Sequence, residues 1–149
     1  MRVFVSYSLR GNDITKEHLV VLRSILRDII SEKSIYIDIF DNPKGYKCSR
    51  KTLYCSAHKH VISELEQADV VLMLSNESSS PWVAREIQHA SKLNIPILRF
   101  ATKKLNALLD GCEKRKLSVK YELHQNIHAL LKPNPRINCR KCIEAFHTM

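Results

Sequence analysis

Patterns typical of strands and of amphipathic helices alternate along residues 1–100 of this chain. The strand patterns are short apolar runs at residues 3–6, 35–40, 70–74 and 95–98. Between them, apolar residues recur every three or four positions, as on a helix that packs on a core, at residues 15–33, from residue 56 onward and at residues 80–93. This alternation of strand and helix, repeated three times, predicts a parallel sheet with right-handed crossovers.

Individual runs add detail to this prediction. Residues 70–74 are continuously apolar, which predicts a strand buried on both faces. Pro96 has no amide hydrogen. At the start of the last strand it must therefore occupy a position that donates no hydrogen bond to a neighbouring strand. Residues 117–131 fit either a strand or a helix, and residues 133–135 break the chain before a last short helix. We expect an α/β fold with a flavodoxin-like doubly wound parallel sheet and helices on both faces.

The composition fits one domain over residues 1–149, with 44% apolar and 26% charged residues. No apolar run approaches the roughly 20 residues of a membrane helix, and the N-terminus opens on a strand pattern rather than a signal peptide. We therefore expect a cytoplasmic protein without membrane contact. The net charge of +9 favours anionic partners. The basic residues are scattered and not interleaved with aromatic residues, so no motif supports nucleic-acid binding.

Five cysteines are an odd number, and a cytoplasmic setting argues against disulfides. Cys139 and Cys142 have the spacing of a zinc-ligand pair, but no second pair accompanies them, and Cys48 and Cys55 lie in another segment. Cys139 and Cys142 share a helical face with two apolar residues. We therefore interpret them as buried packing residues and expect no metal site.

The segment from Ser78 to Ile87 combines a helix start with an aromatic ring and a carboxylate. Serine followed by Pro81 is a helix-entry signal, because the hydroxyl caps the helix and proline fits its first turn. Trp82 and Glu86 are four residues apart and share one helical face. Near the positive end of the helix dipole, Glu86 is expected to be ionised. The simpler alternative is a core tryptophan beside a glutamate that compensates the dipole.

Open α/β sheets bind ligands at the carboxyl ends of their strands, where the strand order reverses. For the order 2-1-3-4-5, this point lies between the first and third strands. The polar residues that follow these two strands are expected to meet at this point, together with one face of the helix that follows the third strand. The predicted site residues are Ser6, Tyr7, Ser8, Asn76, Trp82 and Glu86. The alternative is that the hydroxyl groups only satisfy turns. With only three glycines, the chain contains no GxGxxG or Walker motif.

These motifs resemble those of a TIR (Toll/interleukin-1 receptor) domain. The resemblance lies in the first-strand motif at residues 3–8, the BB loop at residues 41–45, the third strand within residues 62–75 and the tryptophan-x-x-x-glutamate helix at residues 81–86. It covers about residues 1–100, in matching order and spacing, and is weak over residues 101–149. In size and basicity the chain is more similar to small bacterial TIR-like proteins, including those of Thoeris antiphage systems, than to animal receptor domains.

The resemblance implies NAD⁺ cleavage with Glu86 as the catalytic carboxylate, and NAD⁺ as substrate rather than cofactor. Some members of the family cyclise or conjugate the ADP-ribose product into a signal. Others are adaptors that only assemble, so self-association or binding to another TIR-containing or effector protein is implied as well. The BB loop departs from the family because it lacks the arginine-aspartate start and is followed by a basic insertion from Cys48 to Cys55.

A single ionised carboxylate suits this reaction, because nicotinamide leaves a pyridinium as a neutral molecule and needs no proton. The carboxylate would hold the ribose hydroxyls and stabilise the oxocarbenium ion, and Trp82 would stack on a ring. Two alternatives remain open. One is a non-enzymatic interaction module with a TIR fold, in which Glu86 is a surface dipole partner. The other is an enzyme like the nucleoside deoxyribosyltransferases, whose related architecture also applies a carboxylate at ribose.

Overall fold

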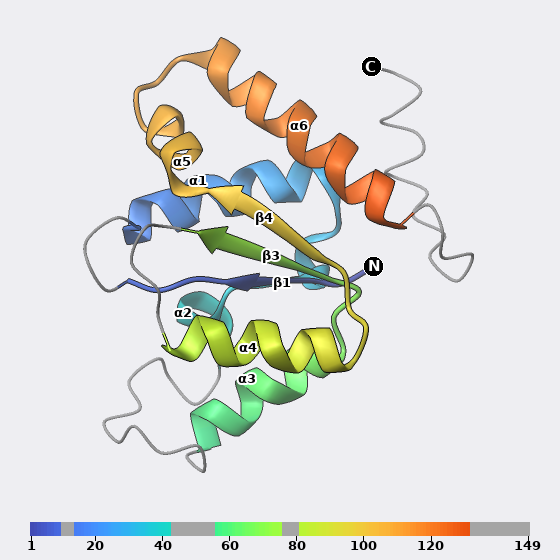
Figure 1. Cartoon of the computed structure of the whole chain (residues 1–149). Coiled ribbons are helices and arrows are strands. Elements are labelled where there is room, and N and C mark those ends of the chain that lie inside the picture. Colours follow the sequence, from blue (N-terminus) through green and yellow to red (C-terminus); the bar gives the residue numbers. More distant parts are fainter. Residues whose placement is uncertain (10–13, 43–55, 76–80, 132–149) are drawn as a thin grey trace.

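The computed structural model describes residues 1–9, 14–42, 56–75 and 81–131 (Figure 1). Strands and helices alternate in this part of the chain, and a 3₁₀ turn at Glu32–Ser34 precedes the second strand. The elements are β1 (Val3–Ser6), α1 (Lys16–Ile29), β2 (Ile35–Tyr36), α2 (Asp38–Asp41), α3 (Ser56–Glu66), β3 (Val70–Ser75), α4 (Pro81–Lys92), β4 (Ile97–Ala101), α5 (Thr102–Leu108) and α6 (Glu113–Leu131). No helix among the described residues is long and apolar enough to cross a membrane.

The four strands form one parallel sheet in the order β2-β1-β3-β4. The predicted parallel sheet with the first strand in its interior is thus confirmed. In the register between β1 and its neighbours, Phe4 lies opposite Tyr36 of β2 and Val71 of β3. The strand order reverses between β1 and β3, because β2 pairs with one side of β1 and the chain then crosses to the other.

Helices cover both faces of the sheet, as predicted (Figure 1). One face, which we call the α1 face, packs against α1, α5 and α6, and Val3 and Val5 point into it. The opposite α4 face packs against α3 and α4, and Phe4 points into it. The side chains of β1 alternate between the two cores because successive residues of a strand point to opposite faces. Ser6 follows Phe4 by two residues and lies on the α4 face.

The second strand is shorter than predicted. Residues 35–40 were expected to be a strand, but β2 ends at Tyr36 and α2 begins at Asp38. The Asp41 carboxylate accepts a hydrogen bond from the Ile37 N–H at 2.8 Å, which takes the place of a bond along the sheet. Arg23 of α1 holds Asp41 in this position through an ion pair of 2.5 Å. A tertiary contact therefore overrides the apolar, β-branched pattern of the segment.

The last described strand begins two residues later than predicted, at Ile97. The Pro96 carbonyl accepts a hydrogen bond from Val71 N–H at 2.9 Å, so proline pairs with β3 as an acceptor, as its ring requires. Residues 117–131, which fitted a strand or a helix, form most of α6. Val119, Leu123 and Ile127 are buried on one side of this helix against the α1 face.

Candidate functional site

The carboxyl end of β1 carries a buried hydroxyl group. Ser6 is fully buried, and its Oγ makes no hydrogen bond of good geometry within the described residues. Phe4 is paired with Tyr36 in parallel register, and α2 begins two residues after Tyr36, at Asp38. Helix α4 packs against β1 and brings Glu86 to the same place. The charge of Asp38 and the hydroxyl of Ser6 both act on the Glu86 carboxyl, so three segments far apart in the sequence meet around this group.

Glu86 lies in the second turn of α4, which begins at Pro81 as predicted. Burial of its carboxyl group, and secondly the negative charge of Asp38, raise the pKa of Glu86 to about 8, although the Ser6 hydroxyl acts in the opposite direction. The pKa of Glu86 is thus shifted in the direction opposite to the one that the helix dipole favours. Desolvation outweighs the dipole because the dipole acts mainly within the first turn.

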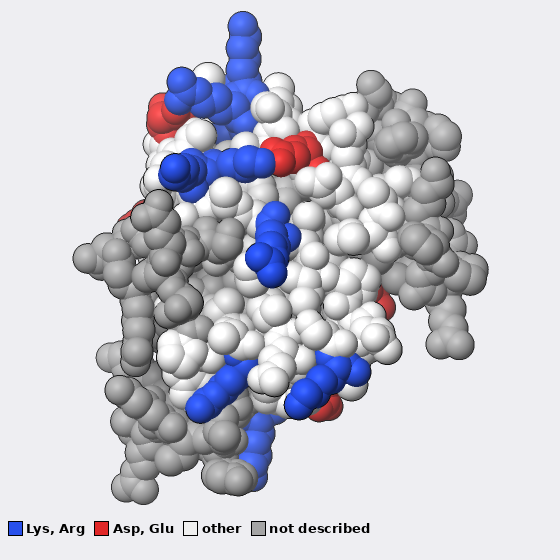
Figure 2. Space-filling model, in the orientation of Figure 1, with Lys and Arg blue, Asp and Glu red and all other residues white. Residues whose placement is uncertain are grey.

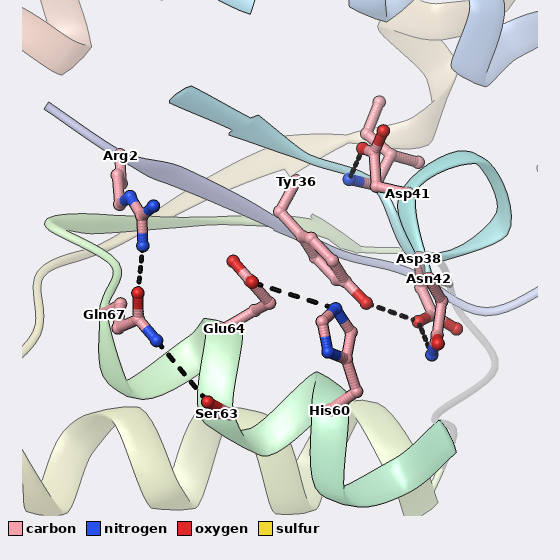
Figure 3. A network of polar contacts seen from close by, with 10 residues as sticks. Arg2, Tyr36, Asp38, Asp41, Asn42, His60, Ser63, Glu64 and Gln67 are labelled. Carbon is pink, nitrogen blue, oxygen red and sulfur yellow. Dashed lines mark hydrogen bonds and ion pairs between the residues drawn. The ribbon is translucent and has the colours of Figure 1, made fainter. Parts of the chain in front are cut away.

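Asp38 is a member of this cluster that the sequence did not reveal. Its Oδ1 accepts hydrogen bonds from the Tyr36 hydroxyl and the Asn42 side-chain amide, both at 2.8 Å (Figure 3). The Tyr36 ring stacks on Phe4 with 5.4 Å between centroids, and burial together with Asp38 raises the pKa of its hydroxyl. The available signal was an acidic residue within the otherwise apolar run of residues 35–40.

Tyr7 lies apart from this cluster. Its ring belongs to the buried core of the α1 face. Its hydroxyl accepts a hydrogen bond from the Ile39 N–H at 2.8 Å and so ties α2 to the end of β1. Ser8 follows and is half-buried. The structure thus brings Ser6 and Glu86 together and directs the Tyr7 ring to the other side of the sheet.

Trp82 precedes Glu86 by one helical turn and is half-buried. The guanidinium of Arg85 lies over its ring, 5.4 Å from the centroid. This cation–π contact engages the ring from the same helix. The expectation that Trp82 stacks on a ligand stays a prediction. The predicted site residue Asn76 and the capping serines at residues 78–80 lie outside the described residues.

A groove of about 650 Å³ runs along the edge of β2. Tyr36 is shared between this groove and the polar network of Figure 3, in which His60 and Glu64 of α3 lie beside the tyrosine ring. Ser6, Asp38 and Glu86 do not line the groove. This groove therefore lies beside Tyr36 and not over the carboxyl cluster, and we assign the chemistry to the cluster.

The described part of the chain gives no metal site, since it holds no group of three or more histidine, cysteine or acidic side chains that could bind an ion. Cys139, Cys142, Cys48 and Cys55 lie outside the described residues, so their packing role stays a prediction. On the face shown in Figure 2, several lysine and arginine side chains gather at the top beside acidic side chains, and the others stand apart with uncharged surface between them. Among the described residues, this face shows no continuous basic track.

The chain matches no protein-family model, no curated protein and no solved structure.

Proposed function

We propose that this chain is an NAD⁺-cleaving enzyme with a flavodoxin-like, TIR-like fold, and that Glu86 is its catalytic carboxylate. The observation that carries the proposal is the half-buried Glu86 carboxyl beside the Ser6 hydroxyl, at the carboxyl ends of parallel strands and next to the reversal of strand order. Clefts at this point are the common ligand sites of open α/β sheets. Carboxyl groups with strongly shifted pKa values are enriched in functional sites.

In this mechanism the C–N bond between ribose and nicotinamide breaks, and the electron pair leaves with the neutral base. Positive charge then develops on the ribose, and ionised Glu86 stabilises it in a site with little water. Glu86 must therefore lose its proton before the bond breaks. Because its pKa is raised to about 8, we expect kcat/KM to rise with pH up to about this value and then level off.

The test is the release of nicotinamide from NAD⁺ by the purified full-length chain, followed by liquid chromatography at pH 8. Glu86→Gln keeps the size of the side chain and removes its charge, and we expect turnover to fall by about 10² to 10³. Glu113→Gln is the matched control, since this side chain is 80% exposed on α6. Equal activity of wild type and Glu86→Gln would refute the mechanism. No turnover by a concentrated or clustered wild type would favour the interaction module.

One observation favours a second candidate. Asp38 supplies another carboxyl group next to Glu86, and glycosidic bonds to poorer leaving groups are usually broken by a pair of carboxyl groups, one of which donates a proton. This arrangement suits a deoxyribosyltransferase-like enzyme that exchanges the base of a nucleoside. Incubation with a 2′-deoxynucleoside and a free base separates the two candidates, because only the second one transfers the sugar.

We propose a cellular role in antiphage immune signalling in the bacterial cytoplasm. The signal would be an ADP-ribose product, and the chain would associate with a second TIR-containing or effector protein. This role rests on the resemblance of the sequence motifs alone.

A further inference from the structure

The groove along the edge of β2 is a hollow that the proposed mechanism does not use. Its volume of about 650 Å³ lies within the range of pockets that hold small organic molecules. One end of the groove lies at the amino ends of the first two strands. Arg2 directly precedes β1, Ser34 directly precedes β2, and the first residues of these strands are paired with each other. The carboxyl cluster, in contrast, lies at the other end of β1.

The backbone of β2 offers this groove no free N–H group. Ile35 N–H donates to the Glu32 carbonyl, and Ile37 N–H donates to the Asp41 carboxylate at 2.8 Å. The Tyr36 N–H between them points the opposite way, toward β1, because successive amides of a strand alternate in direction. An extended peptide that adds to a sheet edge needs such donors. The groove is therefore better suited to a small molecule than to an added strand.

Two cations at the amino-end part of the groove have no acidic partner within the described residues. The Arg2 guanidinium donates to the neutral side-chain amide of Gln67 (Figure 3), and the exposed Lys33 forms no ion pair. Each acidic side chain of the described lining, by contrast, already has a basic partner. These pairs are Arg23–Asp41 at 2.5 Å, Arg27–Glu32 at 3.3 Å and His60–Glu64 at 3.8 Å. Arg2 and Lys33 therefore remain to attract an anion.

Arg23 adds a cationic donor without an acceptor to the lining of the same groove. Its Nη2 is paired with Asp41, but its Nε is buried and has no hydrogen-bond partner in the described part of the chain. Most buried polar groups in folded proteins have a partner, so this exception needs an explanation. An acceptor oxygen of a ligand in the groove is one way to complete the bonding of this group.

The rest of the lining has room for more than an anion. The hydroxyl groups of Ser31 and Ser34 flank Lys33 in the sequence, and Val3, Ile35 and other apolar residues continue the lining. A ligand that matches these features has an anionic head and an uncharged body. A phosphate monoester fits best, because it carries a charge of about −1.5 to −2 at neutral pH and accepts hydrogen bonds from arginine in pairs.

We propose that this groove is a binding site for an organic phosphate. The phosphate group lies at Arg2, Lys33 and Ser34, and the uncharged part of the ligand lies along β2 toward Tyr36. This site is separate from the carboxyl cluster and does not depend on the proposed enzymatic function. Binding is non-covalent, so no bond forms or breaks.

The probes are adenosine 5′-monophosphate (AMP), adenosine, which lacks the phosphate, and inorganic phosphate, which lacks the organic part. Their Kd values are measured with the full chain by nitrogen-15 NMR titration at pH 7.5. We expect AMP to bind on the order of tenfold more tightly than either of its parts, because charge-assisted hydrogen bonds add to burial of the uncharged part. The amide signals of Arg2, Lys33 and Ser34 should shift on binding.

Three results of this titration would overturn the inference. One is equal affinity for AMP and adenosine, which would mean that the phosphate makes no contact. Another is equal affinity for AMP and inorganic phosphate, which would mean an adventitious ion only. The third is a set of shifted signals confined to α4 and the carboxyl end of β1, which would place AMP at the carboxyl cluster instead.

Two substitutions test the cations one by one. Arg2→Gln and Lys33→Gln should each weaken AMP binding on the order of tenfold and leave adenosine binding unchanged. Lys103→Gln is the matched control, since this lysine is also exposed and unpaired among the described residues but lies on α5, outside the groove. Glu86→Gln should bind AMP like wild type.

Lys33→Gln decides the outcome if Arg2→Gln fails to fold, because Lys33 is exposed and gives up no ion pair of the described chain. Unchanged AMP affinity in a folded Lys33→Gln variant would overturn the inference. NAD⁺ cleavage does not enter this test. Loss of the phosphate site would leave the proposed enzyme intact, and an inactive chain that binds AMP in the groove would leave the phosphate site intact.

Discussion

The raised pKa of Glu86 predicts that this side chain destabilises the folded protein at neutral pH and above. In the unfolded chain the carboxyl group titrates near its ordinary value of 4.5, and in the folded chain at about 8. Below pH 4.5 both states hold the proton. Between the two pKa values only the folded state holds it, so the free energy of unfolding falls as pH rises, and it levels off above pH 8.

The size of the effect follows from the two pKa values. Between pH 5 and pH 9 they give a loss of at most about 4 kcal/mol in the free energy of unfolding. Glu86 is partly exposed, so solvent screening reduces this figure, and we expect about 2 kcal/mol. Glu86→Gln has no proton to lose. The variant should therefore be more stable than wild type, by a margin that grows from pH 5 to pH 8 and is constant above it.

The assay is urea unfolding followed by far-ultraviolet circular dichroism at each pH, for wild type, Glu86→Gln and the exposed control Glu113→Gln. Circular dichroism is preferable to tryptophan fluorescence, because the single tryptophan lies on the same helix as Glu86. The difference between wild type and the control should not vary with pH in this range. A pH-independent difference between wild type and Glu86→Gln would refute the reasoning, because it would mean that Glu86 is ionised in the folded protein throughout.

Two further substitutions test the fold around the site. Asp41→Asn removes the charge opposite Arg23, whose side chain is only 13% exposed, so we expect a loss of about 2 kcal/mol in the free energy of unfolding; a neutral result in urea unfolding would show that the ion pair does not hold α2. Leu123→Ala leaves a cavity at a fully buried position of α6 and should lower stability by about 2 to 5 kcal/mol; a loss below 1 kcal/mol would contradict the packing of α6 on the α1 face.

The fold follows from the sequence where local pattern and tertiary packing agree. Periodicity predicted α1 and α4, and proline at residue 81 marked the helix start. The continuous apolar run predicted β3 in the middle of the sheet. The exceptions have tertiary causes. Asp41 ends β2 through a contact with Arg23, and the alternating apolar residues of α6 match a strand pattern although helical spacing decides which of them are buried.

The candidate site was predictable only in part, for a related reason. Topology brought Ser6 and Glu86 together, because both belong to segments at the carboxyl edge of the sheet. The role of Asp38 depends on α2, which no local pattern predicted. The state of the Glu86 proton depends on burial by segments far apart in sequence. The position near the start of the helix favours a lowered pKa, whereas burial in the fold raises the pKa of Glu86.

The burial of Glu86 helps to decide between the enzyme hypothesis and the interaction-module hypothesis. A glutamate that only compensates a helix dipole would lie exposed in the first turn, and its pKa would be lowered. Glu86 instead lies in the second turn, beside another carboxylate and a hydroxyl without a well-placed partner among the described residues, and its pKa is raised. Such an arrangement destabilises the fold, and folded proteins retain local destabilisation mainly at sites that bind or react. An interaction module would have to explain that destabilisation by some other means, whereas the proposed enzyme accounts for it, because strongly shifted pKa values are enriched at functional sites.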